Sequence, residues 1–261
     1  MKKYMLNYSS PWAFLTCFNV LSVILSILLA MKLINFISGV SKSLWINFWC
    51  SMMILMSIAI LWFRDCSRES LIGSLSDDKS CNIKVGMILF LLSEAFLFFS
   101  FFWMFTSSVL VPDLSFWPPS SLKMPSFIGA PSLNTILLVA SSATVTLSHF
   151  EKDIEYPLSK LWLMMTLVLS SLFMIIQYME YTSLPFSFTS GVGGSIFYLA
   201  TGFHGIHVIL GSSLLFGCLI LISNNYYTKD SLLSYEMIIW YWHFVDAIWL
   251  MLYTVFYCWG H

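Results

Sequence analysis

The chain has 261 residues, of which 59% are hydrophobic, 18% are aromatic and only 10% are charged, and its formal net charge is -1. A soluble domain has about 25% charged residues, so a water-soluble globule could not cover this much apolar surface. Disorder requires low hydrophobicity and high net charge. Nucleic-acid binding requires a basic excess, whereas 12 Lys and Arg residues here face 13 Asp and Glu residues. The composition indicates a multi-spanning membrane protein that does not bind nucleic acid.

Seven apolar stretches are long enough to cross a bilayer, which needs about 20 residues per helix. In chain order they cover residues 12–37, 44–63, 82–109, 129–149, 158–181, 192–222 and 233–259. Helices are expected because backbone groups in lipid must be hydrogen-bonded within their own segment. Little of the chain is left over, so we expect an all-α polytopic membrane protein that forms a single transmembrane domain over residues 1–261.

The basic residues predict the orientation of these spans. With the N-terminus inside, nine of the twelve Lys and Arg residues fall in inner segments, namely Lys2, Lys3, Arg64, Arg68, Lys79, Lys84, Lys152, Lys160 and Lys229. The other three fall on the outer side, namely Lys32, Lys42 and Lys123. Cytoplasm-facing or matrix-facing loops carry such a basic excess. We therefore expect an inner N-terminus and an outer C-terminus at His261.

Two arginines follow the second span. Arg64 and Arg68 are four residues apart, so they share one helical face if the helix continues. Guanidinium groups match phosphate oxygens, and lipid head groups lie at this depth. Ordinary interfacial snorkelling, with the neighbouring acids as ion partners, is the alternative. We favour lipid head-group binding by Trp62, Arg64 and Arg68.

Glu94 lies ten residues beyond Lys84, which places it about 15 Å into the third span. A charge at a helix centre costs about 2.5–3.5 kcal/mol on insertion scales, so a carboxyl group there is a functional hypothesis by default. Phenylalanines at positions 96, 98, 99, 101 and 102 make a dry surrounding that favours the neutral acid. One interpretation is a proton relay or a polar anchor for a ligand. The other is a protonated acid that is hydrogen-bonded to another helix.

His204 and His207 are three residues apart in the sixth span, so they share one face. Gly202 and Gly205 beside them leave room for a neighbouring helix or a lipid chain. Histidine is the commonest metal ligand, but an isolated pair lacks a third ligand with obvious geometry. We therefore favour a hydrogen-bonded pair that lines a polar seam over a metal or haem site.

His243 and Asp246 form a second pair with the same spacing, in the seventh span. An Asp beside a His orients the imidazole ring and lowers the cost of burying either group. Catalysis is the alternative, but no nucleophile accompanies the pair in the sequence. We interpret His243 and Asp246 as a structural polar clamp between helices.

Several runs of residues together resemble the cytochrome c oxidase subunit III family. The runs with the most specific residues are 200–208, which reads Ala-Thr-Gly-Phe-His-Gly-Ile-His-Val, and 240–246, which reads Trp-Tyr-Trp-His-Phe-Val-Asp. Shorter matching runs, in chain order, are residues 10–12, 62–65, 68–69, 86–90, 93–94, 102–103, 117–119 and 131–135. The resemblance runs in unbroken order from residue 10 to the C-terminus.

The resemblance implies a core subunit of respiratory complex IV, which reduces O2 to water with electrons from cytochrome c and pumps protons. It implies no redox centre on this chain, since haem a and copper are expected on the partner subunits 1 and 2. In this family the first two helices splay from a five-helix bundle, and the lipid-filled cleft between them holds phospholipids. The family's buried glutamate corresponds to Glu94 and its cleft arginine to Arg64, while His204 and His207 match histidines near the cleft.

The role implied by the resemblance is support of subunit 1: stability during turnover and sustained proton uptake, with oxygen access through the cleft as a further candidate role. Other complex IV subunits and a respiratory supercomplex are candidate partners. The implied location is the mitochondrial inner membrane, with the N-terminus on the matrix side and the C-terminus on the intermembrane-space side.

Three other classes of protein fit part of the pattern. A proton-coupled transporter would use Glu94 and the histidines, act alone and need an aqueous path. A seven-helix receptor normally has an outer N-terminus, which conflicts with the basic asymmetry. A haem-anchoring subunit would show a Soret band in the isolated chain. The residues alone leave the oxidase subunit and the transporter both open, and the family motifs favour the oxidase subunit.

Overall fold

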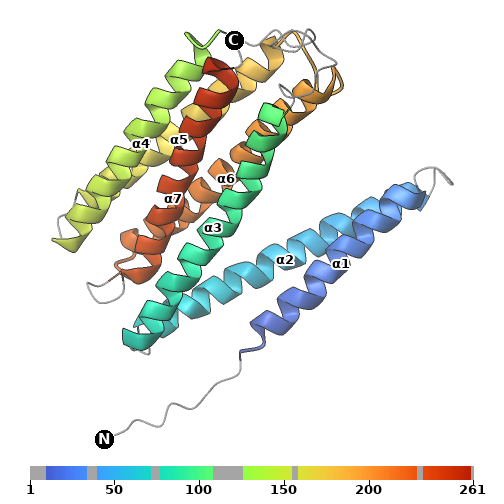
Figure 1. The fold of residues 1–261 in the computed structure, drawn as a ribbon. Helices are drawn as coiled ribbons and strands as arrows, with labels where there is room; N and C mark the ends of the chain where they lie inside the picture. Colours follow the sequence, from blue (N-terminus) through green and yellow to red (C-terminus); the bar gives the residue numbers. More distant parts are fainter. Residues whose placement is uncertain are drawn as a thin grey trace, which may run out of the picture. The chain divides into compact units, whose positions relative to one another are not determined.

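The computed structural model describes residues 10–33, 40–71, 77–107, 126–154, 158–227 and 232–259. Its elements are the helices α1 (Trp12–Leu33), α2 (Val40–Leu71), α3 (Asp77–Ser107), α4 (Ala130–Asp153), α5 (Ser159–Ser183), α6 (Val192–Ser223) and α7 (Leu233–Leu252), followed by a π-helix, η2 (Tyr253–Cys258) (Figure 1). Seven helices in this part of the chain are long and apolar enough to cross a membrane. The predicted all-helical, seven-span fold is confirmed.

Some helix ends differ from the predicted spans. Helix α2 continues to Leu71 and α3 begins at Asp77, whereas the sequence predicted an end at 63 and a start at 82. The predicted spans end at the first charged residues because they were defined by apolar length, whereas a helix can continue through polar residues where it leaves the lipid. The sequence run at residues 117–119 lies outside the described residues, and so do both chain ends. The predicted orientation of the termini therefore concerns positions that the structure does not describe.

The chain divides into two compact units, residues 1–74 and 75–261. In the first unit α1 packs along α2. The Trp12 indole Nε1–H donates to Asp65 Oδ2 over 3.1 Å. This bond joins the start of α1 to the last third of α2, which contains the arginines.

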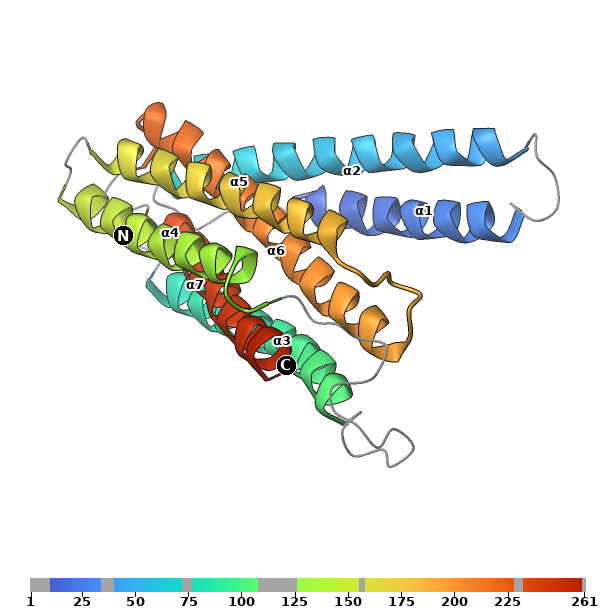
Figure 2. The same ribbon diagram turned by 90° about the horizontal axis from the view of Figure 1, so that it is seen from above.

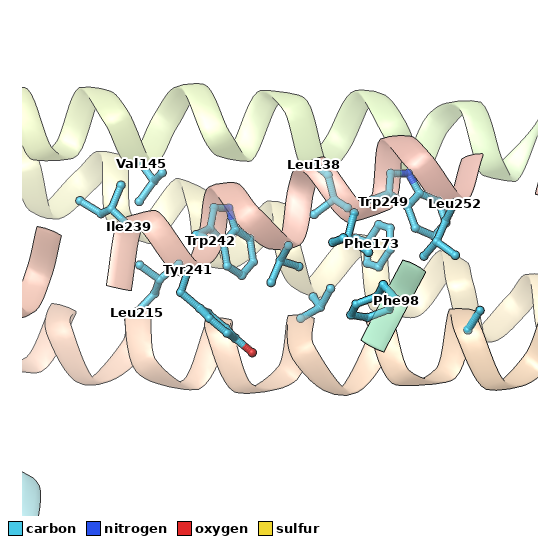
Figure 3. Packing of buried hydrophobic residues seen from close by; sticks show 14 of the residues in the cluster. Phe98, Leu138, Val145, Phe173, Leu215, Ile239, Tyr241, Trp242, Trp249 and Leu252 are labelled. Atoms are coloured by element: carbon cyan, nitrogen blue, oxygen red, sulfur yellow. The ribbon is translucent and has the colours of Figure 1, made fainter. Parts of the chain in front are cut away.

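The second unit contains α3 to α7 and η2. Helix α7 packs against α3, α4 and α6, while α5 packs against α4 and α6. Figures 1 and 2 both show α7 running between α4 and α3. Figure 3 shows Trp242 and Trp249 of α7 among buried side chains from the neighbouring helices, including Leu138 and Phe173. A central helix with large buried rings therefore holds this unit together.

Helix α6 approaches α7 at a glycine. A Cβ atom added at Gly211 would lie 2.9 Å from Cε3 of Trp242, which is closer than real Cβ contacts. At Gly202 and Gly205 no described atom lies within 4 Å of the corresponding Cβ position. A close approach of a neighbouring helix thus occurs at Gly211, whereas no described residue approaches Gly202 or Gly205 as closely.

Large apolar side chains cover the outside of both units. Met53 of α2 is 69% exposed, and Phe96 of α3 and Ile136 of α4 are exposed by 66% and 65%. In water such a surface would be unstable, because each buried side chain of this size contributes about 1.5–3 kcal/mol relative to exposure. Lipid chains are the surroundings that these faces fit.

Candidate functional site

Helices α3 and α6 meet through a carboxyl group and an imidazole. Glu94 Oε2 on α3 lies 3.1 Å from His207 Nε2 on α6. Both side chains are partly shielded, with 24% of Glu94 and 12% of His207 exposed. The sequence left open whether Glu94 acts as a relay, anchors a ligand or bonds another helix. In the structure its carboxyl group contacts another helix.

The other ring nitrogen of His207, Nδ1, determines which group can donate the hydrogen bond between His207 and Glu94. Nδ1 lies 2.7 Å from the carbonyl oxygen of Phe203, and a carbonyl only accepts, so Nδ1 donates. Nε2 then either accepts from a protonated Glu94 or, on an imidazolium, donates to a Glu94 carboxylate. A hydrogen bond between Nε2 and Oε2 thus requires one proton, and with that proton the pair has no net charge.

Aromatic rings surround this contact on its inner side. The ring centroid of His207 lies 5.3 Å from that of Phe98 and 6.3 Å from that of Tyr241. Phe98 is buried, whereas Phe96 and Phe99 are exposed on the outer side of α3. The phenylalanines at these positions therefore differ: Phe98 packs against the pair, whereas Phe96 and Phe99 are exposed.

His204 has different neighbours from His207. It is 1% exposed, and its ring lies 5.8 Å from Phe173 of α5 and 5.2 Å from Trp249 of α7, measured between centroids. Within the described residues neither of its ring nitrogens has a hydrogen-bond partner. The two histidines are three residues apart on α6, but of these two described residues only His207 contacts Glu94.

His243 and Asp246 of α7 are joined through Ser142 of α4. The Ser142 hydroxyl donates to Asp246 Oδ2 over 2.9 Å, and His243 Nδ1 lies 3.3 Å from the same hydroxyl oxygen. Because the hydroxyl group has one hydrogen and gives it to Asp246, His243 Nδ1–H is the donor to Ser142. This geometry is that of a clamp between two helices, and Ser142 is a member that the sequence did not identify.

Arg64 and Arg68 lie on one continuous helix, because α2 extends past both. Arg64 Nη2 lies 3.0 Å from Asp65 Oδ1, and 48% of the arginine side chain is exposed. Trp62 and Arg68 are also exposed. A guanidinium group has five N–H donors, so an ion pair with Asp65 leaves donors for a phosphate group.

Two of the contacts between helices that were not predicted involve an acidic side chain of α7 or α5. Lys84 Nζ of α3 lies 3.1 Å from Glu236 Oε2 of α7, and the Tyr257 hydroxyl donates to Glu180 Oε1 over 2.7 Å. Each contains a carboxyl group near the end of an apolar run, where a side chain can equally face water. Their spacing along the sequence carries no pairing signal.

The described residues contain no group of three or more His, Cys, Asp or Glu side chains that could hold a metal ion. The polar side chains instead contact one another across helices. Glu94 contacts His207, and Ser142 contacts His243 and Asp246. The fold and these contacts define a polytopic helical membrane protein with polar side chains in contact inside its spans.

Comparison with known proteins identifies the family. The model of the family described as cytochrome c oxidase subunit III matches residues 2–261. Cytochrome c oxidase subunit 3 of Yarrowia lipolytica is 38% identical over 256 residues, which covers 96% of this chain and 93% of the relative. The subunit 3 of Struthio camelus is 42% identical over 210 residues, covering 78% and 80%, and that of Rhizopus stolonifer is 37% identical over 256 residues, covering 97% and 89%. The chain belongs to the cytochrome c oxidase subunit III family.

Proposed function

We propose that this chain is a core subunit of a mitochondrial cytochrome c oxidase that carries no redox centre of its own. The family match over residues 2–261 is the observation that carries this proposal. Haem a and copper belong to the partner subunits 1 and 2, where electrons from cytochrome c reduce O2 to water and protons are pumped. This chain stabilises subunit 1, binds phospholipids and supports proton uptake, and oxygen access is a further candidate role.

The proposed location is the mitochondrial inner membrane. Seven spans and the excess of basic residues in the predicted inner segments support a matrix N-terminus and a C-terminus in the intermembrane space. Other complex IV subunits are the proposed neighbours of the exposed apolar faces, and a respiratory supercomplex is a candidate larger assembly.

Lipid binding is proposed at the end of α2 and on α6. The exposed side chains of Trp62, Arg64 and Arg68 supply an amphipathic ring and guanidinium donors for a phosphate head group. On α6, His207 is partly exposed and Gly202 and Gly205 leave room for an acyl chain, with His204 packed behind them.

The support of proton uptake is proposed to depend on Glu94. Its contact with His207 holds one proton at a position inside a span, and the exposed fractions of 24% and 12% leave both groups accessible. A carboxyl group and an imidazole in contact can exchange that proton by a small rearrangement. The site therefore has the chemistry of a proton-holding pair and needs no metal on this chain for that purpose.

The lipid proposal is tested with Arg64→Ala in the intact oxidase complex. We expect the purified variant to lose one phospholipid that the parent complex retains, measured by mass spectrometry of extracted lipids. Lys152→Ala is the matched control, since Lys152 is a basic residue at the end of α4 in the other unit. Unchanged lipid content in Arg64→Ala would overturn the assignment.

The assembly proposal is tested by purification through a tag on this chain. We expect haem-copper subunits to co-purify, and the chain released from them to show no Soret band. The transporter alternative predicts instead that the released chain, reconstituted alone in lipid vesicles, moves a solute with protons. Transport by the chain alone, or a Soret band of its own, would overturn the proposal.

A further inference from the structure

Four buried polar side chains form a cluster in the second unit, separate from the Glu94–His207 pair. The Glu180 cluster consists of Asn134 on α4, Gln177 and Glu180 on α5, and Tyr257 on η2. None of the four is more than 5% exposed. Such groups are stable in an apolar interior only when their hydrogen-bonding atoms are paired.

Direct hydrogen bonds pair only part of the cluster. Tyr257 O–H donates to Glu180 Oε1 over 2.7 Å, and Asn134 Nδ2–H donates to Gln177 Oε1 over 3.0 Å. Gln177 and Glu180 are three residues apart on α5 and so lie on one face. The Gln177 amide also lies near the Tyr257 hydroxyl but forms no direct hydrogen bond with it, so the four side chains make one contiguous group.

Three atoms of this group are buried without a partner among the described residues. They are Asn134 Oδ1, Gln177 Nε2 and Glu180 Oε2. An amide nitrogen only donates and an amide oxygen only accepts. A bound cation would take oxygen ligands and repel the amide N–H, whereas a water molecule both donates and accepts and commonly bonds to about three such orphaned groups. The set of atoms therefore fits water.

The charge of Glu180 follows from its neighbours. The titratable groups that interact with it are three tyrosines, Tyr181 on α5, Tyr198 on α6 and Tyr257 on η2. Across the described ranges no Lys, Arg or His side chain forms an ion pair with Glu180. An isolated buried carboxylate is far more costly than the neutral acid.

We propose that the Glu180 cluster binds one proton, held on Glu180, and one water molecule that joins Glu180 Oε2, Asn134 Oδ1 and Gln177 Nε2. The site sits where α7 passes into the π-helix η2, whose Tyr257 supplies the donor to Glu180. Single-turn π segments often occur at functional sites. The bound proton and water complete the hydrogen bonding that attaches η2 to α5 and α4.

Infrared spectroscopy of the intact oxidase complex tests the proton. We expect a C=O stretching band of a neutral carboxylic acid that is present in the parent complex and in Glu94→Gln but lost in Glu180→Gln. Tyr257→Phe keeps the acid and removes its donor, so the same band should move to higher frequency. Loss of only a carboxylate band in Glu180→Gln, or no shift in Tyr257→Phe, would overturn the proton assignment.

A high-resolution cryo-EM map of the same complex tests the water. We expect one density peak within hydrogen-bond distance of all three orphaned atoms, and its loss in Asn134→Leu, which fills the space with an apolar side chain. A peak that contacts oxygens only and depends on sodium would assign a cation instead. Direct contact of the three side chains with no peak between them would also overturn the water assignment.

Discussion

Glu94 Oε2 lies 3.1 Å from His207 Nε2, and because the second nitrogen of His207 is already bonded to the carbonyl oxygen of Phe203, a hydrogen bond at this contact requires one proton between the two groups. Removing that proton would place a carboxylate against an imidazole lone pair, which is a repulsive contact. The contact joins α3 to α6, and under the proposed function it also holds the proton on which that junction depends.

Substitutions at Glu94 separate these two roles. Glu94→Gln keeps a side-chain N–H that can donate to His207 Nε2, so we expect normal assembly with slower proton uptake. Glu94→Leu leaves His207 Nε2 without its partner, so we expect slower uptake together with a loss of stability of about 0.6–1.7 kcal/mol, which are the average and the maximum for hydrogen bonds between membrane helices. Proton uptake during turnover and thermal dissociation of this subunit measure the two effects.

The contrast between the two variants decides the outcome. Unchanged proton uptake in Glu94→Gln would reject the proton role and leave the joining of α3 to α6 as the role of the pair. Equal stability of Glu94→Gln and Glu94→Leu would instead reject the junction as a contributor to assembly.

Ser142 is predicted to couple α4 to α7 through Asp246. Ser142→Ala should destabilise the subunit by about 0.6–1.7 kcal/mol, because Asp246 Oδ2 loses its donor and Oδ1 already has no partner in the described chain. Asp246→Ala should have a similar effect. The double variant should be less destabilised than the sum, since both single changes remove one shared contact.

The control for this cycle is Ser171→Ala. Ser171 is exposed on α5 and its hydroxyl donates to the carbonyl of Val168 on the same helix, so the change should stay within about 0.5 kcal/mol. Thermal release of the subunit from the complex gives all four values. If the stability changes of Ser142→Ala and Asp246→Ala added strictly in the double variant, that result would contradict the coupling.

The spans were predictable because one physical requirement, apolar length, determines them. The identity of neighbouring helices was not, because it depends on side-chain packing between segments far apart in the sequence. His204 and His207 illustrate the limit: three residues turn a helix to about 60° short of a full turn. That offset directs His204 between Phe173 and Trp249 but His207 toward Glu94.

Glu180 illustrates a second limit. Its position near the end of an apolar stretch was equally consistent with a solvated carboxylate at the interface. In the structure Glu180 is buried, and the π-helical turn after α7 brings Tyr257 to Glu180 Oε1. Motifs with two polar residues on one helix were recognised, while partners on separate helices, such as Ser142 and Tyr257, carried no local signal.

The close approach at Gly211 gives a stability prediction with an internal control. Alanine in a helix is favoured over glycine by about 0.8–1.0 kcal/mol, so Gly202→Ala, with no described atom within 4 Å of the new Cβ, should be neutral or stabilising. Gly211→Ala places its Cβ 2.9 Å from Trp242 Cε3, and such overpacking costs about 1–3 kcal/mol. We therefore expect Gly211→Ala to release the subunit at a lower temperature than both Gly202→Ala and the parent. A Gly211→Ala complex at least as stable as Gly202→Ala would mean that α6 and α7 do not pack this closely in the assembled oxidase.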